Sequence, residues 1–279
     1  MTGTGTSSDP YVIHAEDTLK QKWSDFIMAI GTSGAYVQCP SEVWDMNEIY
    51  PSGWNTQSRI RASRVYGNGL IIRNLYSTCS TTYGLFRIDS RTGYIYDLTF
   101  QNLYYSGSEP CFGGSLNNSI TTFSRCSFSG IIDSNVLFAA GNSLIFSTKD
   151  GKGCSFNLKF NNGAKFHDGS YRLTILSGKI VLSGNSNAVP SSSIIMHNCL
   201  VNGVLPFSKF IIAGKYNVFD MNVSNGQTIS QSSDLVASII NSDKIAAGAT
   251  IAESLIQVTE SQMKNAEYLE SIGFPIGVG

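Results

Sequence analysis

One short pattern recurs along the middle of the chain and restricts the possible folds more than any other feature. In its clear form it reads apolar-x-apolar-x-Asn, as in residues 70–74 and 98–102. Two further copies end at Asn162 and Asn225, and two weaker copies end in Gly130 and Gly203. The first two spacings between the closing residues are both 28 residues, and the later spacings vary.

The alternation within each copy is typical of a strand with one buried face. Its first and third residues point to the same side, and Asn or Gly then tolerates the left-handed backbone of a sharp bend. One such strand cannot bury its apolar side alone, whereas copies stacked about 4.8 Å apart share a continuous core. A β-sandwich also alternates, but its turns recur every ~8–12 residues without a longer period. We therefore predict an all-β fold, a β-solenoid, with corners at Asn74, Asn102, Gly130, Asn162, Gly203 and Asn225.

The N-terminal region carries the first of two helical patterns. One apolar face at helical spacing is formed by Leu19, Trp23, Phe26, Ile27 and Ile30. Glu16 and Asp17 fit a first turn, and Gly31 follows as a stop signal. We expect this helix to cover an exposed end of the sheet, with Lys20, Lys22, Asp17 and Asp25 on its polar face.

The C-terminal region combines closing strands with a second helical pattern. Residues 239–258 contain short apolar runs, and Thr259 to Gln262 forms a capping box. We expect one short helix through Leu269 that Gly273 ends. The chain then divides into an N-terminal segment with its capping helix (1–34), a parallel β-helix (35–227), and closing strands with a capping helix (228–279).

These features resemble the right-handed parallel β-helix proteins of the pectate-lyase-like superfamily. The opening stretch 3–13, which leads into an amphipathic helix, is similar to the start of bacterial and phage surface β-helix proteins. Residues 258–265 and 273–276 resemble the closing segment of repeat-rich surface adhesins and related phage structural proteins. The resemblance implies a right-handed β-helix, an assembly that is often a homotrimer, and contacts with host glycans.

Composition excludes several other classes. The chain has 19 basic and 20 acidic residues and no basic cluster, which argues against nucleic-acid binding. It has no apolar run of membrane-spanning length. Residues 1–10 lack the charged start and apolar run of a signal peptide, so we expect free, buried thiols at Cys39, Cys79, Cys111, Cys126, Cys154 and Cys199. No Cys or His spacing fits a metal site, and we expect no cofactor.

The resemblance and the missing signal peptide together favour a phage virion protein, assembled in the host cytoplasm. We expect a non-enzymatic structural component: a capsid decoration, a head fibre or a tail-associated β-helix. Its partners would be other virion proteins and a host cell-surface glycan. Two alternatives stay open: a secreted bacterial adhesin at the cell surface, and a polysaccharide lyase or hydrolase of the same superfamily.

The enzyme alternative needs acidic or basic groups that face one groove. Glycoside hydrolysis uses two carboxylates about 5 to 9.5 Å apart. The candidate residues are Asp89, Asp97, Asp133 and Lys165. Asp89 stands between Arg87 and Arg91, which is more typical of a solvated ion pair than of a catalytic acid. The paired-Asp, Gly-His-Gly and Arg-x-Lys strings of the hydrolases and the Trp-x-Asp-His string of the lyases are absent.

Aromatic residues favour a binding surface. We expect Phe100, Phe128, Phe156 and Phe160 to stack inside the coil. Tyr and Trp side chains near one coil could stack against sugar rings or line a subunit interface, and the two uses are equally compatible with the sequence. The candidates are Tyr94, Tyr96, Tyr104, Tyr105, Trp44 and Trp54, with Tyr76 and Tyr83 nearby. Two alternatives stay open for Trp44 and Trp54: a place in the N-terminal cap, or a contact with another virion protein.

Overall fold

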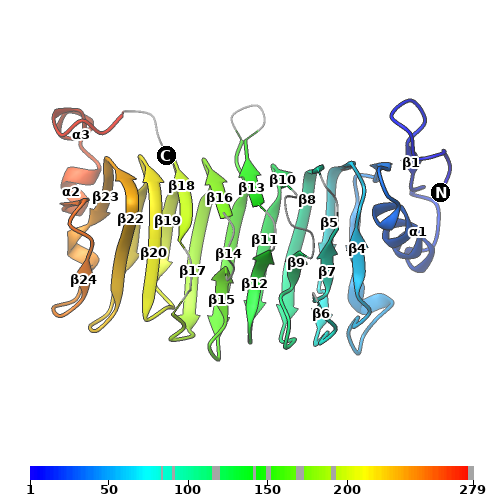
Figure 1. Cartoon of the computed structure of the whole chain (residues 1–279), viewed down its shortest axis with the longest axis horizontal. Helices are drawn as coiled ribbons and strands as arrows, with labels where there is room; N and C mark the ends of the chain where they lie inside the picture. The colour runs from blue at the N-terminus through cyan, green and yellow to red at the C-terminus, as the bar shows by residue number, and fades with distance from the viewer. Residues whose placement is uncertain are drawn as a thin grey trace.

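The recurring pattern forms parallel strands that lie over one another in successive coils (Figure 1). The computed structural model describes residues 1–82, 84–89, 92–114, 120–140, 143–148, 152–167, 173–189 and 193–275. Strand β5 (Arg64–Arg73) pairs with β8 (Thr92–Tyr105) in parallel, with Leu70 opposite Leu98 and Ile72 opposite Phe100. This register reproduces the 28-residue spacing, so the chain folds as a parallel β-helix, as the pattern predicts.

Two parallel sheets wrap the coil. The smaller sheet contains β4 (Ser58–Ile60), β7 (Phe86–Ile88), β9 (Phe112–Gly114), β12 (Val136–Ala140) and β15 (Lys165–His167). Besides β5 and β8, the larger sheet contains β1 (Tyr11–Val12), β2 (Tyr36–Gln38), β3 (Val43–Asp45), β6 (Tyr76–Ser77), β10 (Ile120–Ser124), β11 (Ser127–Ile132), β13 (Ser143–Ser147), β14 (Ser155–Asn161), β16 (Leu173–Leu176), β17 (Lys179–Asn185), β18 (Ile194–His197), β19 (Leu200–Val204), β20 (Lys209–Lys215), β21 (Val218–Asn222), β22 (Thr228–Val236), β23 (Ser238–Asn241), β24 (Thr250–Ile251) and β25 (Leu255–Val258).

The larger sheet bends at a corner and so forms two faces. The first face runs through β2, β10, β13, β16, β18, β20 and β22, and the second through β3, β11, β14, β17, β19, β21 and β23. Strands β5 and β8 run through both faces. Parallel pairing extends from β1 to β25, so the coil begins before residue 35 and continues beyond residue 227.

A column of aromatic rings fills the centre of the coil. Phe100, Phe128 and Phe156 occupy the same register position, and neighbouring rings stack at 5.7 and 5.5 Å between centroids. This confirms the expected stacking for three of the four phenylalanines. Phe160 is buried too, but it aligns with Ile132 and Gly184 and packs against Phe166 and Phe207. The interior is therefore one shared apolar column.

The predicted corners are confirmed in part. Asn74, Asn102 and Asn162 have left-handed backbones, with φ of 57°, 53° and 47°. Gly130 does not align with Asn102, because a register shift places it opposite Leu103 and, on its other side, Leu158. Glycine is required there, since a Cβ would lie 1.9 Å from the carbonyl oxygen of Leu103.

The last two predicted corners also differ from the pattern. Gly203 has a φ of 96°, but it aligns with Leu182 and therefore with Leu158 and Gly130. At the final copy the left-handed residue is Gly226, with a φ of 77°, and Asn225 precedes it in the turn. The recurring pattern in the sequence therefore overstates how regular the corners are.

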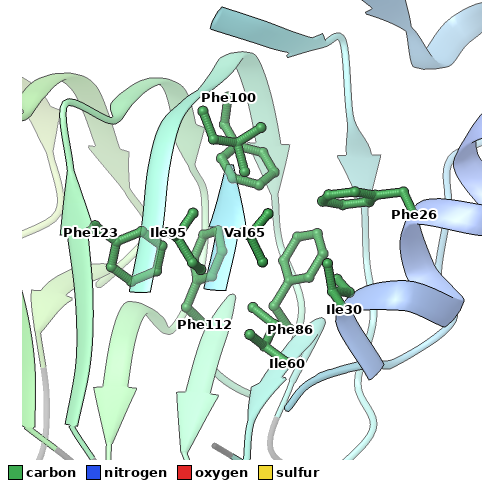
Figure 2. Close-up of a pocket in the computed structure, with 10 residues that line it drawn as sticks. Phe26, Ile30, Ile60, Val65, Phe86, Ile95, Phe100, Phe112 and Phe123 are labelled. Atoms are coloured by element: carbon green, nitrogen blue, oxygen red, sulfur yellow. The ribbon is translucent and has the colours of Figure 1, made fainter. Parts of the chain in front are cut away.

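Helix α1 (Leu19–Gly31) covers the N-terminal end of the coil (Figure 1). Thr18 caps it, so Glu16 and Asp17 precede the helix instead of forming its first turn. Phe26 and Ile30 point toward Ile60 and Phe86 and close the apolar interior, with a gap of about 10 Å³ between them (Figure 2). The predicted end-covering role is confirmed.

The polar face expected for α1 is partly wrong, because two of its charged residues are buried. Lys22 Nζ lies 2.7 Å from Glu42 Oε1 and donates to the carbonyl oxygen of Ala15. Asp25 accepts a hydrogen bond of 3.0 Å from the amino group of Met1. Glu42 and the amino group of Met1 therefore compensate these two charges inside the cap. The helical pattern alone does not reveal where those two groups lie.

The C-terminal end has two short helices where the sequence suggests one. Helix α2 (Glu260–Met263) begins with the predicted capping box of Thr259 and Gln262. Helix α3 (Ala266–Ser271) follows, capped by the Asn265 side chain. Short 3-10 helices span Met46–Glu48 and Ser242–Lys244. The apolar side of α3 packs with Ile239, Val258 and Phe274.

The six cysteines are free and buried, as expected. Cys126, Cys154 and Cys199 lie at one inner corner of the coil, where backbone N–H groups donate to side chains of the next coil. The N–H of Cys126 donates to Cys154 Sγ, and the N–H of Gly178 donates to Cys199 Sγ. Further along, the N–H of Cys199 donates to Asn217 Oδ1. Thiol and amide side chains therefore accept the hydrogen bonds of these backbone N–H groups from one coil to the next.

Candidate functional site

A surface hollow of about 200 Å³ lies beside the second face, near the N-terminal end of the coil. It is lined by Asn47, Asn74, Tyr76, Asn102, Leu103, Tyr104 and Ile131, and we call it the Asn–Tyr hollow. Its lining comes from four consecutive coils. Polar amides and phenol rings therefore share one concave surface, which makes it the strongest candidate for a binding site.

The hollow arises from a tripeptide that the chain repeats in register. Asn-Leu-Tyr occurs at residues 74–76 and again at 102–104. In each copy Asn forms the corner and Leu points into the core, because Leu75 and Leu103 are buried. Tyr76 then pairs with Tyr104 in parallel, and the two rings stack at 4.7 Å with an angle of 4°. Since Tyr76 is 40% exposed, the stack presents aromatic surface to solvent.

A ladder of hydrogen bonds connects the polar side of the hollow. Asn102 Nδ2 donates to Asn74 Oδ1 at 2.7 Å, and Asn74 Nδ2 donates to Asp45 Oδ1 at 2.9 Å. Arg73 Nε donates to the other oxygen of Asp45. The bond from Asn74, with smaller contributions from Asn47 and Arg73, lowers the pKa of the Asp45 carboxyl although burial opposes it. The ladder therefore ends in a carboxylate and holds both amides in fixed orientations.

Tyr104 is held by a second polar group. Its Oη donates to Asp133 Oδ2 at 3.0 Å, while Asn161 and Asn162 donate to the other oxygen of Asp133. Burial, more than any neighbour, raises the pKa of the Tyr104 phenol, so the ring carries a neutral hydroxyl at neutral pH. Asp133 thus positions the tyrosine and is already engaged by three donors.

A second group of tyrosines lies on the first face, and we call it the Tyr–Arg face. Tyr66 stacks on Tyr96 at 5.5 Å, and Tyr94 lies 6.2 Å from Tyr96. The guanidinium of Arg64 lies over the rings of Tyr36 and Tyr94, at 5.8 and 5.5 Å. These side chains are half-buried.

The structure separates the six aromatic candidates into two groups. Tyr94, Tyr96 and Tyr104 lie on the surface, as predicted. Trp44, Trp54 and Tyr105 are buried, so their assignment as binding residues is wrong. Trp44 and Trp54 pack against Phe26 and Trp23 of helix α1, which agrees with the alternative that places them in the N-terminal cap. Trp44 aligns with Ile72 in the core, Trp54 packs edge-on against Trp23, and Tyr105 Oη donates to the carbonyl oxygen of Cys79. Tyr83 lies outside the described residues.

Alternation could have identified one of these errors. Tyr104 and Tyr105 are adjacent on a strand, so only one of them can face solvent. The sequence also contains a signal for the hollow that the corner assignment missed, namely the repeat of Asn-Leu-Tyr at the 28-residue spacing. Asn47 has no such signal, because it lies in the 3-10 helix that follows β3.

The carboxylates considered for catalysis do not form a pair. Asp89 follows β7, Asp97 forms the corner between the two faces within β8, and Asp133 follows β11. Asp97 pairs with Arg125, which adopts the same left-handed corner one coil later. Lys165 lies in β15 of the smaller sheet, next to Val136. Each candidate therefore occupies a different part of the coil.

Asp89 differs from the solvated ion pair that its sequence neighbours suggest. Its side chain is only 6% exposed, and Arg87 Nε donates to it at 2.8 Å. Arg61 and Arg59 approach from the preceding coil, with Nε at 3.6 and 3.9 Å from Oδ2. Arg91, the partner expected from the sequence, lies outside the described residues.

In the described part of the chain, no three His, Cys, Asp or Glu side chains gather in a way that could hold a metal ion. No helix among those residues has the length and apolar character needed to cross a membrane. No family model, curated protein or solved structure matches this chain.

Proposed function

We propose that this protein is a non-enzymatic β-helix that binds carbohydrate in the Asn–Tyr hollow, as the host-attachment component of a phage particle. The observation that supports the binding role is the stacked pair of Tyr76 and Tyr104 beside the ladder of Asn74 and Asn102. Sugar rings stack their C–H faces on aromatic rings and exchange hydrogen bonds with amides. The hollow offers both kinds of contact on a rigid frame.

The rigidity of this frame favours binding. Stacking fixes both tyrosines, and the amides hydrogen-bond to each other, so little side-chain entropy is left to lose when a ligand binds. The same coils continue above and below the hollow, so a polymer can extend past it along the stack. A polysaccharide therefore fits the surface better than a small compact ligand.

The test uses an array of bacterial surface polysaccharides and three variants. Tyr104→Ala removes one ring of the stack and is expected to weaken binding at least tenfold, or about 1.4 kcal/mol. Tyr104→Phe keeps the ring and loses the hydroxyl that donates to Asp133, so we expect a smaller loss. Tyr96→Ala, on the Tyr–Arg face, is the matched control. Equal loss in Tyr104→Ala and Tyr96→Ala would contradict the assignment.

The particle context is tested separately. A virion component should be present in purified phage particles at fixed stoichiometry, whereas a secreted adhesin should appear at the bacterial surface. The mass of the isolated protein in solution tests the homotrimer that the resemblance implies. Detection only in the medium or on cells would favour the adhesin alternative.

The polysaccharide lyase or hydrolase alternative has less support. Asp89 is paired with arginine, Asp97 pairs with Arg125, and Asp133 accepts three hydrogen bonds. Incubation with host polysaccharide followed by reducing-end and unsaturated-uronate assays tests it. Product that disappears in Asp89→Asn or Asp133→Asn would replace the binding proposal with an enzymatic one.

A further inference from the structure

Three arginines, Arg59, Arg61 and Arg87, surround the Asp89 carboxylate where the smaller sheet meets the first face. Arg59 lies directly opposite Arg87 in parallel register, and Arg61 lies near Asp89. Like charges in directly opposite positions destabilise a sheet. Among the described residues, Asp89 is the carboxylate that pairs with these three guanidinium groups, so this part of the surface carries an excess of positive charge.

Two of the guanidinium groups keep their hydrogen-bond donors available. Arg59 and Arg61 are 46% and 37% exposed, and their Nε atoms lie 3.9 and 3.6 Å from Asp89. These distances are too long for hydrogen bonds, so the attraction orients the two side chains without using their N–H groups. Among the described residues, neither guanidinium donates a hydrogen bond. Arg87, in contrast, holds Asp89 directly at 2.8 Å.

The positive surface continues around the corner of the same coil. Arg64 follows Arg61 by three residues, so their Cα atoms are at most about 11 Å apart. Its guanidinium lies between the rings of Tyr36 and Tyr94 on the Tyr–Arg face. Arg59, Arg61 and Arg64 therefore form a row along one coil, which we call the arginine row.

We propose that the arginine row binds a polysaccharide that carries repeated oxyanion groups, either carboxylates or sulfates. Guanidinium groups bind such oxyanions through paired charge-assisted hydrogen bonds, and a row matches a polymer with negative groups along its length. Nucleic acid fits less well, because its affinity needs many phosphate contacts and this chain has a net charge of −1. The row is on a different part of the coil from the Asn–Tyr hollow and does not depend on the function proposed there.

The experiment measures binding of polygalacturonate, dextran sulfate, neutral dextran and duplex DNA to the full chain. Arg59→Gln/Arg61→Gln removes the two available guanidinium groups and leaves Arg87 on Asp89, which protects the fold. We expect the wild type to bind at least one acidic polysaccharide, with about tenfold weaker binding in the double variant. The acidic polymer that binds identifies carboxylate or sulfate as the preferred group. Neutral dextran is expected not to bind.

The matched control is Lys244→Gln/Lys264→Gln, which removes the same charge at the other end of the coil. Those lysines each pair with their own carboxylate, Asp220 and Glu260. The control is expected to bind like the wild type, and thermal melting checks that both double variants are folded. Equal loss in both would show a non-specific charge effect and overturn the proposal.

Two other results would overturn it as well: no binding of either acidic polymer, or DNA binding as tight as that of the acidic polysaccharides. Tyr104→Ala, which tests the Asn–Tyr hollow, is expected to leave binding of the acidic polymer unchanged. Failure of the arginine row is thereby distinguishable from failure of the proposed function.

Discussion

At the scale of single residues, the coil depends on side chains that repeat their contacts from one turn to the next. Phe128 stacks between Phe100 and Phe156 and meets Phe112, Phe123, Phe138 and Phe146 edge-on. Each ring thereby supports the coil before it and the coil after it. Removal of a central ring should therefore destabilise both neighbouring coils.

We expect Phe128→Ala to lower the free energy of unfolding by about 3–5 kcal/mol, because it leaves a cavity that adjacent coils cannot fill. Urea unfolding followed by circular dichroism measures the loss. Val181→Ala, on an outward position of β17, is the control and should change stability by about 0.5 kcal/mol or less. Similar losses in both variants would mean that Phe128 is not central to the core.

A second residue-scale prediction concerns His197, whose Nδ1 is buried without a hydrogen-bond partner among the described residues. Burial, and then the neighbouring Lys215, lower the pKa of this imidazole below its usual value of about 6.5. The unfolded chain therefore binds the proton more readily than the folded chain. Its contribution to stability is present above about pH 6.5 and is lost as the pH falls through the folded-state pKa.

Unfolding measured at about pH 7.5 and about pH 5 checks this sign. The wild type should be less stable at the lower pH, and His197→Gln should reduce the difference between the two values. A difference that stays unchanged in the variant would assign the pH dependence to other groups.

Single residues also show which features of the structure could be predicted from the sequence. Asn74 and Asn102 share a spacing and a corner, and both were predictable. Gly130 follows at the same spacing but aligns with Leu103, because the strand shifts register after Phe128. Such a shift depends on contacts between neighbouring coils, which a repeat within one chain does not reveal. The same holds for Trp44, whose burial depends on the register between β3 and β5.

At the scale of elements, the two ends differ from the middle because each end coil has a neighbour on one side only. Helix α1 places Trp23 and Phe26 over the first coil, with Phe26 edge-on to Trp44 at 5.7 Å. Its apolar spacing made the helix predictable. The burial of Lys22 and Asp25 was not, since it depends on Glu42 and on the amino group of Met1.

We expect Phe26→Asp to release the cap without unfolding the central coils, since each coil contacts mainly its neighbours. Hydrogen exchange should then show lost protection in α1 and β2, while β14 and β17 keep theirs. Met28→Asp, on the exposed side of the same helix, is the control and should leave protection unchanged. Uniform loss along the chain would show that the coils unfold as one unit.

At the scale of the whole molecule, register creates the surfaces on which function is proposed. Tyr76 stacks on Tyr104 only because residues 28 positions apart lie in adjacent coils. The group of arginines around Asp89 likewise needs β4 and β7 in register, which places Arg59 opposite Arg87. The sequence predicted the stacking and the aromatic surface. It did not predict the hollow, which also needs Asn47 from outside the repeat.

The in-register parallel stack is therefore the central claim, and a disulfide-trapping measurement tests it most directly. Thr99 and Ser127 are register partners on adjacent strands, whose Cα atoms lie about 4.8 Å apart, within the range of a disulfide. Thr99→Cys/Ser127→Cys should cross-link on oxidation of the native protein, as read by mass spectrometry. Thr99→Cys/Ser155→Cys, two coils apart, should not. A cross-link in the second variant and none in the first would contradict the stack.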